Sequence, residues 1–237
     1  MAQSQQYEPL AAAQGVDAVI ARMRALAAGL PPRDGVAVFN RVYLAVTEAV
    51  DRAIDSGPAG GFPDRAAAVT LDVRFAERYL TAVDGASPGP ALGPACWRPL
   101  LQFRRHPGVH PLQFALAGIN AHIGHDLALA VVDSCHALGC APAALEDEFE
   151  RVGDLLITLE ERIREELMPG PDLLQVADPL THLLGSWSLE RARDAAWGAA
   201  RALWALRGLP GVAAEFARSL DTSAGLVGRM LLTPLPG

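Results

Sequence analysis

The chain has 237 residues, of which 51% are hydrophobic, enough to bury the core of one domain or at most two small ones. All 20 basic residues are arginine, which excludes Schiff-base chemistry, pyridoxal phosphate attachment and a phosphate-binding loop built on lysine. The net charge of −7 without a dense basic block argues against a nucleic-acid partner. No apolar run reaches the ~18 residues of a membrane span, so no membrane association is expected.

The N-terminal sequence MAQSQQYEPLAAAQG contains no basic segment followed by an apolar one, so we expect a cytoplasmic protein without a secretory signal. The odd number of cysteines (Cys96, Cys135 and Cys140) then predicts free thiols. The spacing of Cys135 and Cys140 is not that of a zinc-binding CxxC pair. Abundant Ala, Gly, Pro and Arg with no lysine indicates a GC-rich, actinobacterial genome.

Helical periodicity runs through almost the whole chain, whereas strand patterns are scarce. We therefore predict an all-α fold, with a flexible N-terminus over residues 1–14 and a single irregular helical bundle over residues 15–233. In chain order, the predicted helices span Val16–Gly29, Gly35–Asp55, Asp64–Asp84, Cys96–Arg105, Pro111–Leu138, Pro142–Met168, Ser186–Arg207 and Val212–Leu232.

The central helix carries the most informative pattern, HPLQFALAGINAHIGHDLALAVVDSCH, over residues 110–136. At about 100° per residue, one arc of this helix collects its polar side chains. These are His122, His125, Asp126, Asp133 and His136. No Glu or Arg occurs on this helix, whereas the helix over Pro142–Met168 has many, as a solvent face does. The polar arc is therefore expected to line an internal cavity, with a closed hydrogen-bond network and a plain surface face as the alternatives.

Within the arc, His122 and Asp126 lie one turn apart, so the carboxylate can hold the imidazole in one tautomer and leave its other nitrogen as a general base. A divalent metal bound by His122, His125 and Asp126 is the alternative, although the spacing is not that of HExxH and no other cofactor is expected. Asn120 lies on the apolar side of the helix, where a clamp between helices is the competing interpretation.

Other helices supply candidate partners of the His122–Asp126 pair, called the dyad below. Asn40 and Tyr43 share one face of the second helix, while Glu48 belongs to a row of charged residues that resembles a surface ion-pair row. Trp187 and Asp194 lie close to one line of a later helix.

Three segments together resemble a family of uncharacterised, mainly actinobacterial, all-helical proteins, over about residues 15–230. They are DGVAVFNRVYLAVTEAV, WRPLLQFRRHPGVHPLQFALAGINAHIGHDLALAVV and GSWSLERARDAAW, with the patterns FNRxYLxVTExV and FALAGxNAHIxxDL. The resemblance implies a single helical domain and no established activity. Its shared polar positions fall on Asn40, Tyr43, Glu48, Asn120, His122, Asp126, Trp187 and Asp194. His125 falls where the pattern is loose, which favours the dyad over a metal site.

These observations predict an enzyme of bacterial secondary metabolism that cyclises, dehydrates or isomerises a small hydrophobic molecule by acid–base chemistry. His122, Asp126 and Tyr43 are the expected catalytic residues. The expected substrate-binding residues are Asn40, Asn120, Glu48, Trp187 and Asp194. The alternatives are a non-catalytic helical protein that binds a ligand or a protein partner, and a metalloenzyme that uses the His and Asp side chains. The oligomeric state is left open.

Overall fold

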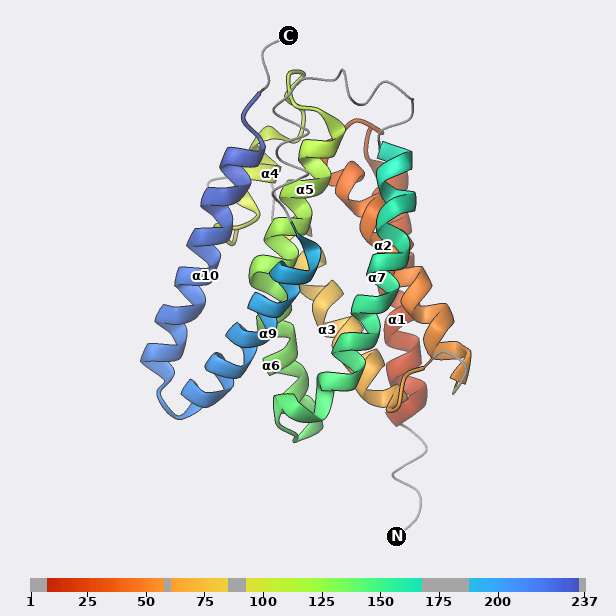
Figure 1. Ribbon diagram of the computed structural model, residues 1–237. Coiled ribbons are helices and arrows are strands. Elements are labelled where there is room, and N and C mark those ends of the chain that lie inside the picture. The colour runs from red at the N-terminus through yellow and green to blue at the C-terminus, as the bar shows by residue number, and fades with distance from the viewer. Residues whose placement is uncertain (1–7, 58–60, 85–92, 168–187, 235–237) are drawn as a thin grey trace.

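The computed structural model describes residues 8–57, 61–84, 93–167 and 188–234, with side chains from residue 15 and not over 157–167 (Figure 1). Throughout these residues the chain is helical and contains no strand, so the predicted all-α fold is confirmed. The longer helices are α1 (Glu8–Gly29), α2 (Gly35–Asp55), α3 (Arg65–Asp84), α4 (Arg98–Phe103), α5 (Pro111–Ala121), α6 (Leu127–Leu138), α7 (Glu146–Leu167), α9 (Leu189–Ala205) and α10 (Pro210–Leu231).

Helices α5 and α6 run end to end through the middle of the bundle, with α10 on one side and α2 and α7 on the other (Figure 1). Helix α5 packs against α2 and α10, while α6 packs against α3 and α9. One buried cluster joins α1, α2, α3 and α5, and a second joins α6, α7 and α9. The polar residues at the middle of the central helix therefore lie where the two parts of the core meet.

The predicted central helix is interrupted. A five-residue π-helix, η2 (His122–Asp126), joins α5 to α6, and the backbone N–H of Leu127 donates to the carbonyl of His122. A π turn widens the helix by one residue and is frequent at functional sites. The end of α6 agrees with the prediction, because Gly139 adopts a φ of 66° directly after Leu138.

The segment Pro111–Leu138 also has the length and mean hydropathy of a membrane span, although 72% of that window is buried inside the protein. The core helix of a globular protein meets the same criterion, so this is weak evidence for a membrane.

The first helix is longer than predicted, because α1 begins at Glu8 rather than at Val16. Shorter 3-10 segments precede α7 (Pro142–Leu145) and follow α9 (Leu206–Gly208).

Candidate functional site

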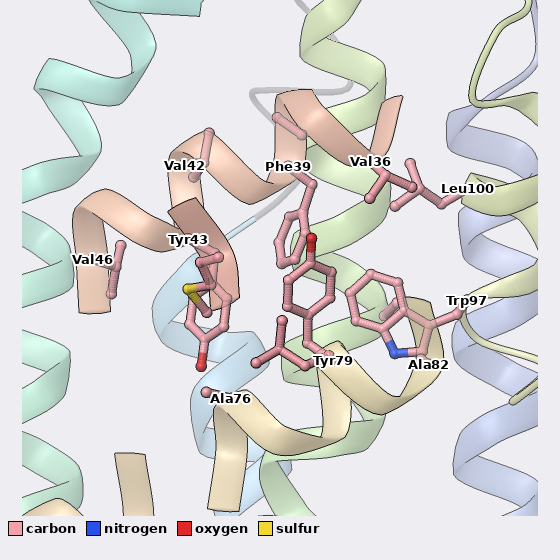
Figure 2. Packing of buried hydrophobic residues seen from close by; sticks show 14 of the residues in the cluster. Val36, Phe39, Val42, Tyr43, Val46, Ala76, Tyr79, Ala82, Trp97 and Leu100 are labelled. Carbon is pink, nitrogen blue, oxygen red and sulfur yellow. The ribbon is translucent and has the colours of Figure 1, made fainter. Parts of the chain in front are cut away.

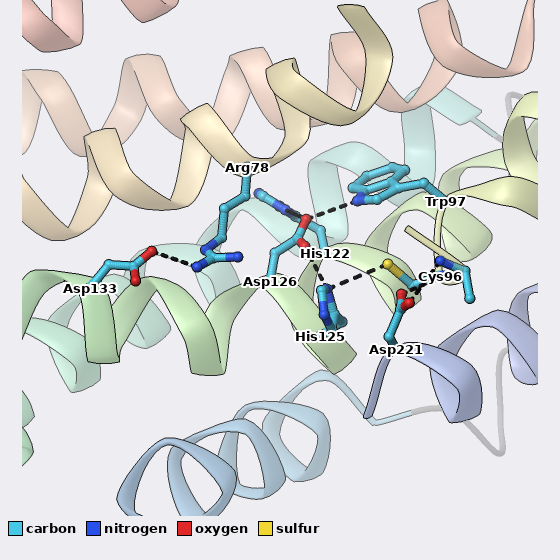
Figure 3. Close-up of polar contacts among 9 residues, drawn as sticks. Arg78, Cys96, Trp97, His122, His125, Asp126, Asp133 and Asp221 are labelled. Atoms are coloured by element: carbon cyan, nitrogen blue, oxygen red, sulfur yellow. Dashed lines mark hydrogen bonds and ion pairs between the residues drawn. The ribbon is translucent and has the colours of Figure 1, made fainter. Parts of the chain in front are cut away.

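The π-helix brings two imidazoles onto one carboxylate (Figure 3). His122 Nδ1 lies 3.0 Å from Asp126 Oδ2, and His125 Nδ1 lies 2.8 Å from Asp126 Oδ1. Trp97, from the turn before α4, donates its indole N–H to Asp126 Oδ2 over 2.9 Å. Asp126 is 2% exposed, so these bonds replace the water that a carboxylate otherwise requires.

The surrounding bonds set the protonation states of this network. Burial alone would raise the pKa of Asp126, but the hydrogen bonds from His122 and His125 outweigh burial and lower it. Burial lowers the pKa of His122, against the opposing influence of Asp126. A neutral His122 that donates its Nδ1 hydrogen to Asp126 carries its lone pair on Nε2. That nitrogen is therefore the available base.

An aromatic shell fixes the orientation of His122. The ring of Phe75 stacks on the imidazole, with centroids 3.6 Å apart and planes inclined by 4°, and Tyr43 meets it edge-on at 4.4 Å. Phe39, Tyr43, Tyr79 and Trp97 face one another in the same part of the core (Figure 2). Helix α5 approaches this cluster closely at Gly118, where an added Cβ would lie 2.3 Å from the ring of Phe39.

A cavity of about 100 Å³ opens beside His122. Three buried polar atoms on its lining residues have no hydrogen-bond partner within the described part of the chain: His122 Nε2, Tyr43 Oη and Asp72 Oδ2. The remaining wall is largely apolar and includes Phe39, Val42, Val46, Ile119, Ile123 and Leu127. Buried polar atoms are normally satisfied, so three such atoms around one apolar cavity mark a place for a ligand or for ordered water.

Burial raises the pKa of Asp72 to about 7, and the charge of Asp51 adds to this effect. The same desolvation, assisted by Asp72, raises the pKa of Tyr43 well above its ordinary value. Near neutral pH the cavity therefore combines a neutral imidazole, a protonated phenol and a carboxyl group that is close to half protonated. Groups tuned in this way can accept and donate protons in the same pH range.

On the side of Asp126 away from the apolar cavity lies a polar cleft. His125, Asp126 and Asp133 line a cleft of about 490 Å³, together with Arg74, Glu77, Arg78 and Thr81 of α3. Asp133 pairs there with Arg78 at 2.5 Å. The polar arc of the central helix is thus split between two spaces: His122 lines the apolar cavity, whereas His125, Asp126 and Asp133 line the polar cleft. His136 lies outside both, exposed and packed against Trp204 at 5.0 Å between ring centroids.

Four of the predicted substrate-binding residues, Asn40, Asn120, Glu48 and Asp194, do not line the cavity beside His122. The buried amide of Asn40 donates to the Met23 carbonyl over 2.9 Å and accepts from the Tyr79 hydroxyl over 3.1 Å, so it links α1, α2 and α3. The Asn120 amide donates to the Ala224 carbonyl over 2.8 Å and ties α5 to α10.

Glu48 pairs with Arg24 at 2.8 Å on the surface, as its charged row on α2 suggested. Asp194 is exposed and borders a separate groove beside α7. Trp187 lies outside the described residues. Both acidic side chains point away from the cavity because the faces of α2 and α9 that carry them are turned outward.

The three residues of the predicted metal site contact one another, since His122 and His125 direct their Nδ1 atoms at Asp126 itself. Within the described ranges, a different group brings possible ligand atoms within 4.8 Å of one another: Cys96, His125 and Asp221. There the carboxylate of Asp221 accepts the backbone N–H groups of Ala95 and Cys96, each over 2.9 Å. These hydrogen bonds hold the Asp221 carboxylate against the turn before α4.

Sequence reasoning missed Asp72, Phe75, Trp97 and Arg193 as cavity or network residues. Asp72 had a readable signal, since its neighbours one turn away on α3, Ala68, Val69, Phe75 and Ala76, are all apolar. A single carboxyl group on an apolar helix face predicts a buried acid. Trp97 and Arg193 had no such signal, because their partners lie on other helices.

The comparisons with known proteins give a family without an assigned activity. No curated protein and no solved structure matches the chain. Residues 16–234 match the sequence model of a family of unknown function, DUF5995. Because the match covers nearly the whole length and the resemblance noted in the sequence agrees with it, the chain belongs to this uncharacterised family.

Proposed function

We propose that the protein is an enzyme that moves protons on a small, largely apolar molecule bound in the cavity beside His122. The observation that carries the proposal is the convergence of His122 Nε2, Tyr43 Oη and Asp72 Oδ2 on one apolar cavity, where all three are buried and have no hydrogen-bond partner among the described residues. Native proteins rarely leave such atoms unsatisfied unless a bound molecule completes them.

In this proposal His122 acts as the general base and Asp126 keeps the imidazole in the tautomer whose lone pair faces the cavity. Asp72, with its pKa near 7, supplies a proton from another wall of the same cavity, and the Tyr43 hydroxyl orients an oxygen of the ligand. Proton removal at one carbon and proton delivery at another atom together support isomerisation, dehydration or cyclisation. The arginine-rich, lysine-free composition supports a place in bacterial secondary metabolism.

Deuterium exchange tests the chemistry without knowledge of the natural substrate. Neutral ketones of matching size (butan-2-one, 3-methylbutan-2-one and 3,3-dimethylbutan-2-one) are incubated with the protein in D₂O, and loss of their α-proton signals is followed by NMR. We expect exchange faster than in buffer, and a loss of about 10²–10⁴-fold in His122→Gln. His136→Gln, which changes an exposed histidine of the same helix, is the matched control and should retain the full rate.

Exchange no faster than in buffer, or a rate that His122→Gln leaves unchanged, would show the acid–base proposal to be wrong. The completeness of the Asp126 network favours a second candidate, a protein that binds a ligand without transforming it. In that case ketones would raise the melting temperature of the wild-type protein while their α-protons would not exchange.

A further inference from the structure

A buried arginine lines the same cavity as His122. Arg193 of α9 is 6% exposed, and its guanidinium lies over the Phe149 ring, 4.3 Å from the centroid, and donates to the Phe149 carbonyl. It also rests against Gly153, where an added Cβ would lie 2.8 Å from Nη2. Glycine is therefore the residue that lets the guanidinium occupy this position between α7 and α9.

Arg193 has no carboxylate within ion-pair distance among the described residues. A buried cation is costly unless an anion or several hydrogen bonds compensate it, and the Phe149 carbonyl is the only acceptor that the described residues offer it. Its planar group has further N–H donors, in the fork that matches a carboxylate. Among the described residues, no carboxylate completes this charged donor set.

The Arg193 guanidinium borders two different spaces, the apolar cavity and a surface groove. On one side lies the apolar cavity, and on the other a surface groove of about 180 Å³ that includes Glu150, Asp154, Glu190 and Asp194. Burial lowers the pKa of Arg193, and the charges of Glu150, Asp194 and Asp154 oppose this effect. The groove repels an anion, so an anionic group that reaches Arg193 is favoured only from the cavity side.

We propose that the cavity binds a small apolar monocarboxylic acid, with its carboxylate against the Arg193 guanidinium and its carbon skeleton beside His122. This inference rests on the proposed function and adds the class of its substrate. The volume of about 100 Å³ sets the size, since a cavity of about 150 Å³ holds benzene. The skeleton is therefore a short branched chain, smaller than a six-membered ring, and the apolar walls exclude a second charged group.

Calorimetry with matched acids and amides tests the proposal. The probes are isobutyrate, isovalerate and pivalate, each compared with its own amide, which keeps the shape and removes the charge. We expect at least one acid to bind the wild-type protein at least tenfold more tightly than its amide. Arg193→Met should remove that preference, with a much smaller loss of affinity for the amide than for the acid. Arg191→Met, an exposed arginine on the same helix, is the control and should change neither affinity.

Arg193→Lys keeps the charge without the fork, so it keeps the proposal testable if Arg193→Met fails to fold. It should bind the acid more weakly than wild type and still prefer it to the amide. Equal affinities for acids and amides, acid binding that survives in Arg193→Met, or no binding of any acid would each overturn the carboxylate assignment. The ketone exchange assay uses neutral compounds, so it decides the proposed acid–base function independently of these outcomes.

Discussion

The two histidines of the π-helix share one carboxylate and face opposite surroundings. His125 lies on the polar side, where its Nδ1 meets Asp126 and the Cys96 thiol within a network that includes Asp221. His122 faces the apolar side, where its Nε2 and the neighbouring Tyr43 and Asp72 oxygens have no partner within the described structure. The difference separates polar groups that hold the fold together from polar groups that are free to meet a ligand.

Asp126→Asn is expected to have the largest effect, because it changes the group that both sides share. The amide offers one oxygen to three N–H donors, from Trp97, His122 and His125, and directs its own N–H₂ group at the others. We expect a loss of about 3–5 kcal/mol in the free energy of unfolding, measured by urea denaturation. Asp133→Asn, which affects a half-exposed ion pair, should cost less than about 1 kcal/mol. Equal losses of unfolding free energy in the two variants would show that the buried Asp126 network stabilises the fold no more than the Arg78–Asp133 ion pair does.

Asp72→Asn should have the next largest effect, and its sign depends on pH. The pKa of Asp72 is about 7 in the folded protein and close to 3.8 in the unfolded chain, so the folded state binds the extra proton between these values. The stability that Asp72 provides is therefore complete below pH 3.8 and is lost as the pH rises through about 7.

The asparagine variant has no carboxyl group to ionise, so it should be more stable than wild type by about 2–4 kcal/mol at about pH 8. The difference should shrink towards about pH 4, as urea unfolding at the two pH values would show. The histidines are common to both proteins, so their titration cancels in the comparison. A difference that stays constant with pH would show that Asp72 ionises normally in the folded protein.

The smallest effects are expected from two tyrosine variants, which compare a hydroxyl of the structural network with a hydroxyl of the cavity. Tyr79→Phe removes the hydroxyl that donates to Asn40, so it should cost about 1–2 kcal/mol by stranding a buried acceptor. Tyr43→Phe removes a hydroxyl that has no partner among the described residues, so it should be neutral or stabilising by up to about 1 kcal/mol. Thermal unfolding of the two variants measures both values. A larger loss from Tyr43→Phe would mean that its hydroxyl has a partner in the native state.

Local sequence patterns determined the helices, the cap at Gly139 and the placement of His122 one turn before Asp126, because these features depend on residues close together in the chain. The same patterns identified the catalytic dyad that we propose. They also placed Asn40 on a polar face of the second helix and Asn120 on the apolar side of the central one, where a clamp between helices was one interpretation, without indicating which backbone carbonyls the two amides bind.

Only the tertiary structure decided which polar groups meet. Asp72 and Arg193 come to the cavity of His122 from helices far away in sequence, and the π turn divides the polar arc between two surroundings. Helical periodicity tells which side of a helix is buried, since that follows from the spacing of apolar residues. It does not tell which helix covers that side, because this depends on how all the helices pack together around the shared core.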